Sequence, residues 1–310
     1  MSAVDALMTP EARFRDLPDF PYAPRTLSVE PFGLTMAYLD EGPRDGPVAL
    51  LLHGEPSWSF LYRHMVGPLV DAGLRVVAPD LIGFGRSAKP TRQSDYTYAR
   101  HVAWLASLLA QLDLRGITLF GQDWGSLTGL RLAAEHEERF SALVIGNGYL
   151  PDGTPPRMRP KELAAAVPFL VWRTFAKLTP VLPIGRILNY GSGGRLSEAE
   201  IAAYDAPFPS ATYEAGARAF PALVPISPRD PAAEANRAAW RVLERWEKPF
   251  VTAFSDGDPI TRGLERRLQR RIPGAQGQPH VTVKGGHFLQ ERSGPELARV
   301  VIDVTRRAAG

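Results

Sequence analysis

The 310-residue sequence predicts an α/β fold, with a mostly parallel central sheet that is flanked by helices and interrupted by a helical cap. Three observations favour this fold. Short apolar runs of strand length alternate with longer segments of helical periodicity over most of the chain. Glycine-rich turns follow several of the apolar runs. A proline-rich stretch in the middle has helical segments but no convincing buried strand, which is typical of an insertion.

Strand and helix patterns alternate through the first half of the chain. The predicted strands are two segments within 26–40, around a turn at 31–33, followed by 47–52, 75–78, 117–120 and 142–145. Most are continuous apolar runs, which suits burial on both faces of a parallel sheet. The predicted helices lie between them, at 59–71, at 97–112 and from Leu127 onward, and a glycine-rich loop occupies 83–87. This order predicts βαβ units with right-handed crossovers.

The alternation stops at residue 151 and resumes near residue 229. Between these points we predict a cap with short helices at 168–178 and 197–204. The elements expected after the cap are a helix ending near 246, a strand at 249–254, a helix from about 263, a strand at 280–284 and a closing helix at 294–307. The predicted domains are therefore a core of residues 1–150 and 229–310 and a cap of residues 151–228. A cap inserted after a strand would lie over the carboxyl edge of the sheet, where open parallel sheets place their sites.

Composition excludes several classes of function. The chain has no cysteine, so it has neither a disulfide framework nor a thiolate nucleophile or metal ligand. The 36 Lys and Arg residues nearly balance 33 Asp and Glu, and they are scattered along the chain, which argues against nucleic-acid binding. No apolar run approaches the ~20 residues of a membrane span, and none resembles a signal peptide. We therefore expect a cytoplasmic protein that does not contact membranes, with a monomer as the default state.

A candidate nucleophile lies in the turn between the strand at 117–120 and the next helix. Gly121, Asp123 and Gly125 have the spacing G-x-nucleophile-x-G, in which small residues relieve crowding around a sharply turned catalytic residue. Taken alone, the pattern is better explained by an aspartate that caps the helix. Asp123, however, stands at the end of a central strand, and candidates for an acid and then a base follow it along the chain. This arrangement favours the catalytic interpretation.

The partners of this nucleophile follow the last two predicted strands. His287 comes directly after the strand at 280–284, where a loop imidazole can reach the same sheet edge. The preceding strand is followed by Asp256 and Asp258. We prefer Asp258 as the acid that orients His287, and Asp256 remains an alternative, since it is also suited to bonding its own turn.

An aspartate nucleophile favours displacement at a saturated carbon. Its product would be an alkyl ester, which water activated by His287 would hydrolyse, with backbone N–H groups of Glu55 and Trp124 binding the oxyanion. The indole of Trp124 can donate a hydrogen bond to a departing anion without supplying a proton, which suits a halide. A second donor is expected from the cap, where Phe169 and Trp172 share one helix face, although such a pair is more often simple packing.

These motifs together resemble the haloalkane dehalogenases of the α/β-hydrolase fold, and within them the subfamily with an Asp-His-Asp triad and two halide-binding tryptophans. The matching segments are 53–63 (HGEPSWSFLYR), 79–87 (PDLIGFGRS), 122–125 (QDWG), 204–209 (YDAPFP), 220–221 (FP) and 286–288 (GHF). Relatives outside the subfamily carry an acid soon after the strand that follows the elbow, and an Asn after His-Gly. Here residues 147–151 contain no carboxylate, and Glu55 replaces that Asn.

The resemblance implies a role for each matching residue. Asp123 would be the nucleophile, His287 the base and Asp258 the acid, while Trp124 and Trp172 would bind the halide and the amides of Glu55 and Trp124 the oxyanion. The family lines its apolar pocket at the positions of Phe169, Phe220, Pro221, Val224 and Ile260, and Leu127 stands where some members carry Phe. The implied reaction converts a small haloalkane into an alcohol, a halide and a proton, with no cofactor or metal.

Two other functions remain open at this level. An epoxide hydrolase would use the same aspartate and histidine, but its leaving oxygen needs a proton, for which Tyr190, Tyr204 and Tyr213 are possible donors. A non-catalytic ligand-binding protein could use the same fold, because fold alone does not define function. The indoles of Trp124 and Trp172 favour a dehalogenase over an epoxide hydrolase.

Overall fold

An eight-stranded sheet forms the centre of the computed structural model, which describes residues 4–154 and 160–310. In the described residues the strand order is β10-β9-β8-β7-β4-β5-β3-β2. The strands are β2 (Arg25–Val29), β3 (Leu34–Glu41), β4 (Val48–Leu52), β5 (Arg75–Pro79), β7 (Ile117–Gln122), β8 (Phe140–Gly146), β9 (Phe250–Ser255) and β10 (Val281–Val283). Neighbours from β5 to β10 run parallel, whereas β2 and β3 form an antiparallel edge. The predicted mostly parallel sheet is confirmed.

The register of the central strands brings their carboxyl ends to one line. Leu52 of β4 pairs with Gly121 of β7, which pairs with Ile145 of β8, and Ile145 pairs with Thr252 of β9. Every residue of β4, β7 and β9 is buried, as expected for strands covered on both faces. The loops that follow these strands therefore leave the sheet at one edge.

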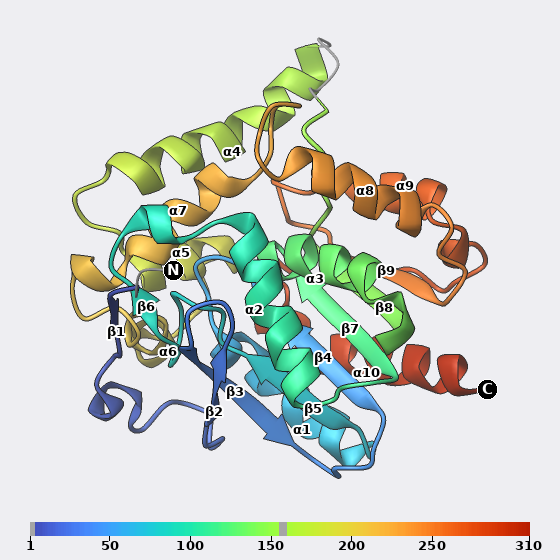
Figure 1. Cartoon of the computed structure of the whole chain (residues 1–310), viewed down its shortest axis with the longest axis horizontal. Coiled ribbons are helices and arrows are strands. Elements are labelled where there is room, and N and C mark those ends of the chain that lie inside the picture. Colours follow the sequence, from blue (N-terminus) through green and yellow to red (C-terminus); the bar gives the residue numbers. More distant parts are fainter. Residues whose placement is uncertain (1–3, 155–159) are drawn as a thin grey trace.

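Helices cover both faces of this sheet. In Figure 1, α2 and α3 lie in front of the sheet, while α1 and α10 pack together behind it. The core helices are α1 (Arg63–Asp71), α2 (Tyr98–Gln111), α3 (Trp124–Glu135), α8 (Ala233–Leu243), α9 (Leu264–Arg271) and α10 (Gln290–Ala309). The last begins four residues before the predicted position and is kinked at Ser293, two residues before Pro295, which lacks a backbone donor. Among the described residues, none of the helices is both long and apolar enough to cross a bilayer.

Four helices between β8 and α8 make up most of the predicted cap. They are α4 (Pro160–Leu178), α5 (Ile184–Gly191), α6 (Glu198–Asp205) and α7 (Ala215–Leu223), and they lie together at one end of the molecule (Figure 1). The sequence predicted α6 and the second half of α4. It missed α5 and α7, because α5 is only two turns long and α7 contains Pro221. The domain boundaries at 151 and 228 stay a prediction.

The N-terminal segment joins the core to the cap. A two-stranded antiparallel sheet forms between β1 (Ala6–Leu7) and β6 (Lys89–Pro90), and strands of two residues leave no recognisable pattern in the sequence. The Thr9 hydroxyl then donates to the carbonyl oxygen of Pro207, at 2.7 Å, and Arg13 Nε donates to that of Ala206, at 3.1 Å. The loop after α6 is thus held by residues from the beginning of the chain.

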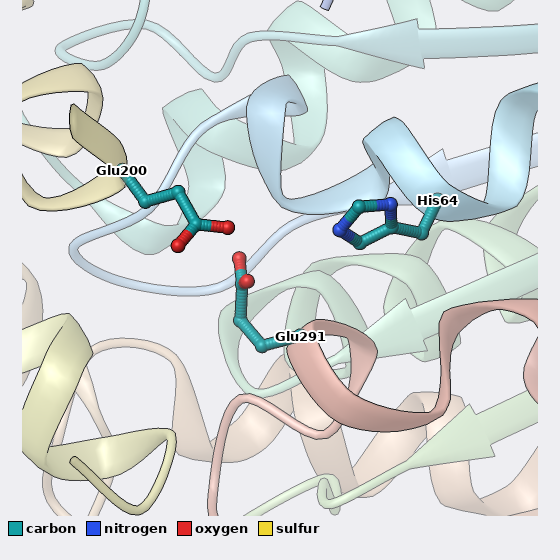
Figure 2. A group of neighbouring side chains, drawn as sticks. All are labelled: His64, Glu200 and Glu291. Carbon is teal, nitrogen blue, oxygen red and sulfur yellow. The ribbon is translucent and has the colours of Figure 1, made fainter. Parts of the chain in front are cut away.

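Three side chains of the type that ligate metals meet where the cap touches the core. Figure 2 shows Glu200 of α6 and Glu291 of α10 pointing toward each other, with His64 of α1 beside them. The buried guanidinium of Arg63 lies 2.5 Å from Glu291 and 2.6 Å from Glu200, and the Tyr204 hydroxyl also donates to Glu291. Because the guanidinium of Arg63 already pairs with both carboxylates, we assign the cluster to an ion-pair network that ties α6 to the core.

Candidate active site

Asp123 occupies a sharp turn between β7 and α3. Its φ of 49° and ψ of −123° are unfavourable for a residue with a side chain, as expected for an elbow that exposes its central residue. The turn also brings α3 against β4, where a Cβ on Gly125 would lie 1.7 Å from the carbonyl oxygen of Leu52. Glycine is therefore required at position 125 for the turn to pack, which confirms the predicted elbow geometry.

The Asp123 carboxylate points between two loops of the sheet edge. Its Oδ1 accepts a hydrogen bond from the backbone N–H of Glu55, at 2.8 Å, and its Oδ2 lies 3.4 Å from Nε2 of His287. Close approach of the first loop depends on Gly54, where a Cβ would lie 2.4 Å from the Cβ of Asp123. The Glu55 amide, predicted to bind the oxyanion, is thus in hydrogen-bonding contact with the predicted nucleophile.

The second nitrogen of His287 faces Asp258. Nδ1 lies 3.1 Å from Oδ1 of Asp258, whose buried carboxylate also accepts from the amides of Ile260 and Thr261, at 2.9 and 3.1 Å. Asp256 instead lies at the surface, 2.6 Å from Lys284. The structure therefore brings Asp258 to the imidazole and leaves Asp256 in a surface ion pair.

The charges around His287 determine its protonation. Burial alone would lower the pKa of the imidazole, but Asp258 and Asp123 outweigh burial and raise that pKa to about 10. Burial would likewise raise the pKa of Asp258, yet His287 and the hydrogen bonds to its carboxylate lower it to about 2. In the free enzyme, both effects favour an imidazolium held between two carboxylates.

A cavity of about 1000 Å³ opens above these residues, at the upper end of the usual range for ligand pockets. Asp123 and His287 lie on its wall, while the buried Asp258 stands behind His287. Most predicted pocket and halide-binding residues also line it, namely Trp124, Leu127, Phe169, Trp172, Pro221, Val224 and Ile260. The wall is mainly apolar, so the cavity suits a small apolar molecule that presents one reactive carbon to Asp123.

Phe220 is the exception among the predicted pocket residues. It is fully buried and is not among the residues lining the cavity. Its ring centroid lies 4.4 Å from those of Trp124 and His101 and 4.7 Å from that of Phe84. The side chain of Phe220 lies behind Trp124 because α7 turns it toward the core, and Pro221 takes the place on the wall. Phe220 therefore supports the indole of Trp124.

The two predicted halide-binding tryptophans differ in their hydrogen bonds. Trp172 Nε1, on α4, donates to Oε2 of Glu55 at 3.2 Å. Trp124 Nε1 has no hydrogen-bond partner within the described ranges 4–154 and 160–310. The indole of Trp124 is thus free to donate to a ligand, whereas that of Trp172 is already in use.

Asn147 is an important residue that the sequence analysis did not assign to the site. Its Nδ2 donates to Ser255 Oγ, at 2.8 Å, and to the carbonyl oxygens of Gly286 and His287, at 3.0 and 2.9 Å. Its backbone carbonyl accepts from the Asp123 amide, at 3.1 Å. One amide side chain therefore joins the loop after β8 to the last residue of β9 and to the loop after β10. The available sequence signal for Asn147 is its position directly after the strand β8.

Gln122 also contacts the predicted base. Its Nε2 lies 3.2 Å from the carbonyl oxygen of His287 and 3.3 Å from Nε2 of the same residue. Gln122 belongs to the matching segment 122–125, but its contact with His287 was not predicted, since the two residues lie 165 positions apart in the sequence. Gln122 and Asn147 together position His287 from the β7 and β8 sides.

Comparisons with known proteins agree with this geometry. The model of the alpha/beta hydrolase fold family matches residues 47–293. Haloalkane dehalogenase 1 of Mycobacterium tuberculosis is 55% identical over 300 residues, covering 95% of this chain and 97% of that protein. A haloalkane dehalogenase of Psychrobacter cryohalolentis is 51% identical, covering 96% of each chain.

A solved structure extends the likeness to three dimensions. It is the tetrameric haloalkane dehalogenase of Paraglaciecola agarilytica, which aligns with a TM-score of 0.85 at 34% identity, covering 99% of this chain and 98% of that chain. The family model and both curated relatives span the elbow, the cap and His287. The chain therefore belongs to the haloalkane dehalogenases, within the α/β-hydrolase fold family.

Proposed function

We propose that the protein hydrolyses the carbon–halogen bond of small haloalkanes, with Asp123 as nucleophile, His287 as base and Asp258 as orienting acid. The observation that carries the proposal is the imidazole of His287 between the two carboxylates, with Asp123 at the wall of a mainly apolar cavity. Membership of the haloalkane dehalogenases supports the same reaction.

In the first step, Oδ of Asp123 attacks the carbon that carries the halogen. The new carbon–oxygen bond forms as the carbon–halogen bond breaks, and the halide leaves with the bonding electron pair. The products are a neutral alkyl ester on Asp123 and a halide ion. Trp124 lines the cavity with a free indole donor, which supports its role in binding the departing halide. Trp172 lies on the same cavity and is proposed as the second donor.

In the second step, His287 removes a proton from a water molecule that attacks the ester carbonyl. The resulting oxyanion would accept hydrogen bonds from the amides of Glu55 and Trp124. Collapse of the intermediate breaks the bond between the carbonyl carbon and the alkoxy oxygen, and the alcohol and the Asp123 carboxylate are restored. His287 is then protonated, as in the free enzyme, and the one proton released in the cycle is the proton that His287 lost to solvent after the ester formed. The net products are an alcohol, a halide and a proton, and the reaction needs no cofactor.

The positions of the cap tyrosines disfavour an epoxide hydrolase. Such an enzyme would need phenolic donors aimed at the leaving oxygen. The Tyr204 hydroxyl instead donates to Glu291 in the ion-pair network, and Tyr213 is not among the cavity-lining residues of the described chain. Tyr190 lines the cavity, but its side chain is 87% exposed. The cap therefore brings one exposed tyrosine to the cavity and not the paired donors of that chemistry, and the one core tyrosine on the described wall, Tyr149, lies with its hydroxyl 3.3 Å from Arg271.

The test is halide release from 1,2-dibromoethane and 1-bromobutane, with Asp123→Asn as the control and styrene oxide as a parallel substrate. We expect halide release by the wild type and none by the variant. Diol formation from styrene oxide without halide release would assign the site to epoxide hydrolysis. Inactivity on both substrate classes would favour the non-catalytic ligand-binding function.

Every residue of the proposed catalytic machinery lies on one chain, so we expect the monomer to be active. Light scattering of the active fraction measures its oligomeric state.

A further inference from the structure

The side chain of Glu55 has no role in the mechanism above, which uses only its backbone amide. Its carboxyl group is buried on the wall of the catalytic cavity, beside Asp123. One carboxyl oxygen, Oε2, accepts the indole hydrogen bond of Trp172 at 3.2 Å. The other, Oε1, is buried without a partner in the described part of the chain. A buried carboxyl group with only one hydrogen bond is unusual and calls for an explanation.

The contact matters because an indole has a single N–H group. Trp172 can direct that donor to Glu55 or to a halide, but a full hydrogen bond to both at once is excluded. Burial and the neighbouring Asp123 raise the pKa of the Glu55 carboxyl well above its usual value, which favours the neutral acid. Breaking the hydrogen bond from Trp172 costs less free energy when Glu55 is a neutral acid than when it is a buried carboxylate. The indole of Trp172 can therefore leave Glu55 and return to it.

We propose that the Glu55 carboxyl group is an internal competitor of the halide for the indole of Trp172. The indole donates to Glu55 in the free enzyme, transfers to the halide as the carbon–halogen bond breaks, and returns to Glu55 when the halide leaves. Glu55 thereby weakens the binding of the halide product and speeds its release. This inference rests on the proposed role of Trp172 and adds a residue that sets halide affinity.

Bromide binding tests the competition directly. The dissociation constant is measured by the change in tryptophan fluorescence on bromide titration of the whole enzyme. Glu55→Leu keeps the backbone amide but removes the acceptor, so we expect bromide to bind about five- to tenfold more tightly, as one neutral hydrogen bond predicts. Glu55→Gln is the matched control, since its amide oxygen still accepts, and bromide affinity should stay within about twofold of the wild type.

Trp172→Phe separates this inference from the proposed function. If Trp172 binds halide, this variant weakens bromide binding, and adding Glu55→Leu to it produces no further tightening. Unchanged affinity in Trp172→Phe would refute the halide-binding role itself. Weakened binding in Trp172→Phe, together with no effect of Glu55→Leu, would refute only the competition. If Glu55→Leu and Glu55→Gln strengthen bromide binding equally, the cause would be the charge of Glu55 and not its competition for the indole of Trp172. That result would also overturn the proposal.

A measurement on the wild type covers the case in which Glu55→Leu fails to fold. Infrared difference spectra recorded on bromide addition should show the protonated C=O stretch of Glu55 moving to higher frequency, because that oxygen loses the indole hydrogen bond. The band is assigned by its disappearance in Glu55→Gln. A bromide difference spectrum that is the same in the wild type and in Glu55→Gln would contradict the exchange.

Discussion

His287 Nε2 lies 3.4 Å from Oδ2 of Asp123, so the proposed base and the proposed nucleophile form a charged pair before any substrate binds. The imidazole holds its proton because two carboxylates face it. Alkylation turns the Asp123 carboxylate into a neutral ester and removes one of them. We therefore expect the pKa of His287 to fall after the first step, so that formation of the ester activates the base for the second step.

The two chemical steps should consequently differ in their dependence on pH. Hydrolysis of the ester needs neutral His287, so its rate should rise with pH and level off well below the value of about 10 that applies to the free enzyme. Alkylation does not need a neutral imidazole and should stay flat over the same range. Single-turnover kinetics between about pH 6 and 10 separate the steps. If both steps showed the same dependence of rate on pH, with a midpoint near 10, formation of the ester would not change the pKa of His287.

Asp123→Asn should abolish alkylation, because a neutral amide is a poor nucleophile at saturated carbon. We expect halide release to fall by at least about 10⁴-fold, as for other nucleophile deletions. The measurement is stopped-flow halide detection, with intact-protein mass spectrometry to show that the asparagine has not deamidated. Halide release at a substantial fraction of the wild-type rate by undeamidated protein would remove Asp123 from the nucleophile role.

His287→Phe and His287→Gln should leave alkylation possible and block the second step. After incubation with 1-bromobutane, the protein mass should rise by one butyl group, and proteolysis should place the adduct on Asp123. Halide release should stop after about one equivalent, since the ester is no longer hydrolysed. Full turnover by either variant would exclude His287 as the base.

Asp258 and Asp256 provide a matched pair of substitutions. Asp258→Asn removes the buried negative charge that faces His287 Nδ1, so ester hydrolysis should slow by about 10³- to 10⁴-fold, as in comparable triads. Asp256→Asn removes an exposed ion pair with Lys284 and keeps an oxygen that can accept from the Gly285 amide, so it should keep turnover within about twofold of the wild type. Steady-state halide release measures both. A greater loss of turnover in Asp256→Asn than in Asp258→Asn would make Asp256 the acid that orients His287.

The ion-pair network between cap and core should contribute to stability unequally. Arg63→Met leaves the buried Glu291 carboxylate without its cation, and we expect the free energy of unfolding to fall by about 3–5 kcal/mol. Glu200 is more exposed, so Glu200→Gln should cost less than about 1 kcal/mol. Urea denaturation measures both values. Equal losses of unfolding free energy in the two variants would show that the ion pair with Glu291 is not the main contribution of Arg63 to stability.

The positions of the three proposed catalytic residues were predictable because they follow from the sheet. Asp123 and Asp258 follow β7 and β9, which are buried along their whole length, and His287 follows the short edge strand β10, which pairs with β9. The paired register from β4 to β9 then brings the ends of those strands to one edge. Period and position along the chain were therefore sufficient to place Asp123 and His287 at this edge, but they left Asp256 open as an alternative to Asp258.

Other parts of the site depend on packing that periodicity does not encode. Phe220 and Pro221 are adjacent in sequence, yet the orientation of α7 buries the first and places the second on the cavity wall. The contacts of Asn147 and of Glu55 with Trp172 join residues from separate elements, and their amide and carboxyl groups have many possible partners. Residues 155–159 of the predicted cap lie outside the described residues, as do the side chains of 160–166 and 168.

The order of the strands also bears on how the chain is synthesised. β8 belongs to the first 150 residues, but its far edge is covered by β9, which begins at Phe250, after the cap. While a ribosome makes the cap, the apolar edge of β8 has no partner strand and can pair with another nascent chain. A chain truncated before β9 should therefore aggregate, and the rate at which the cap is translated sets how long this edge stays open.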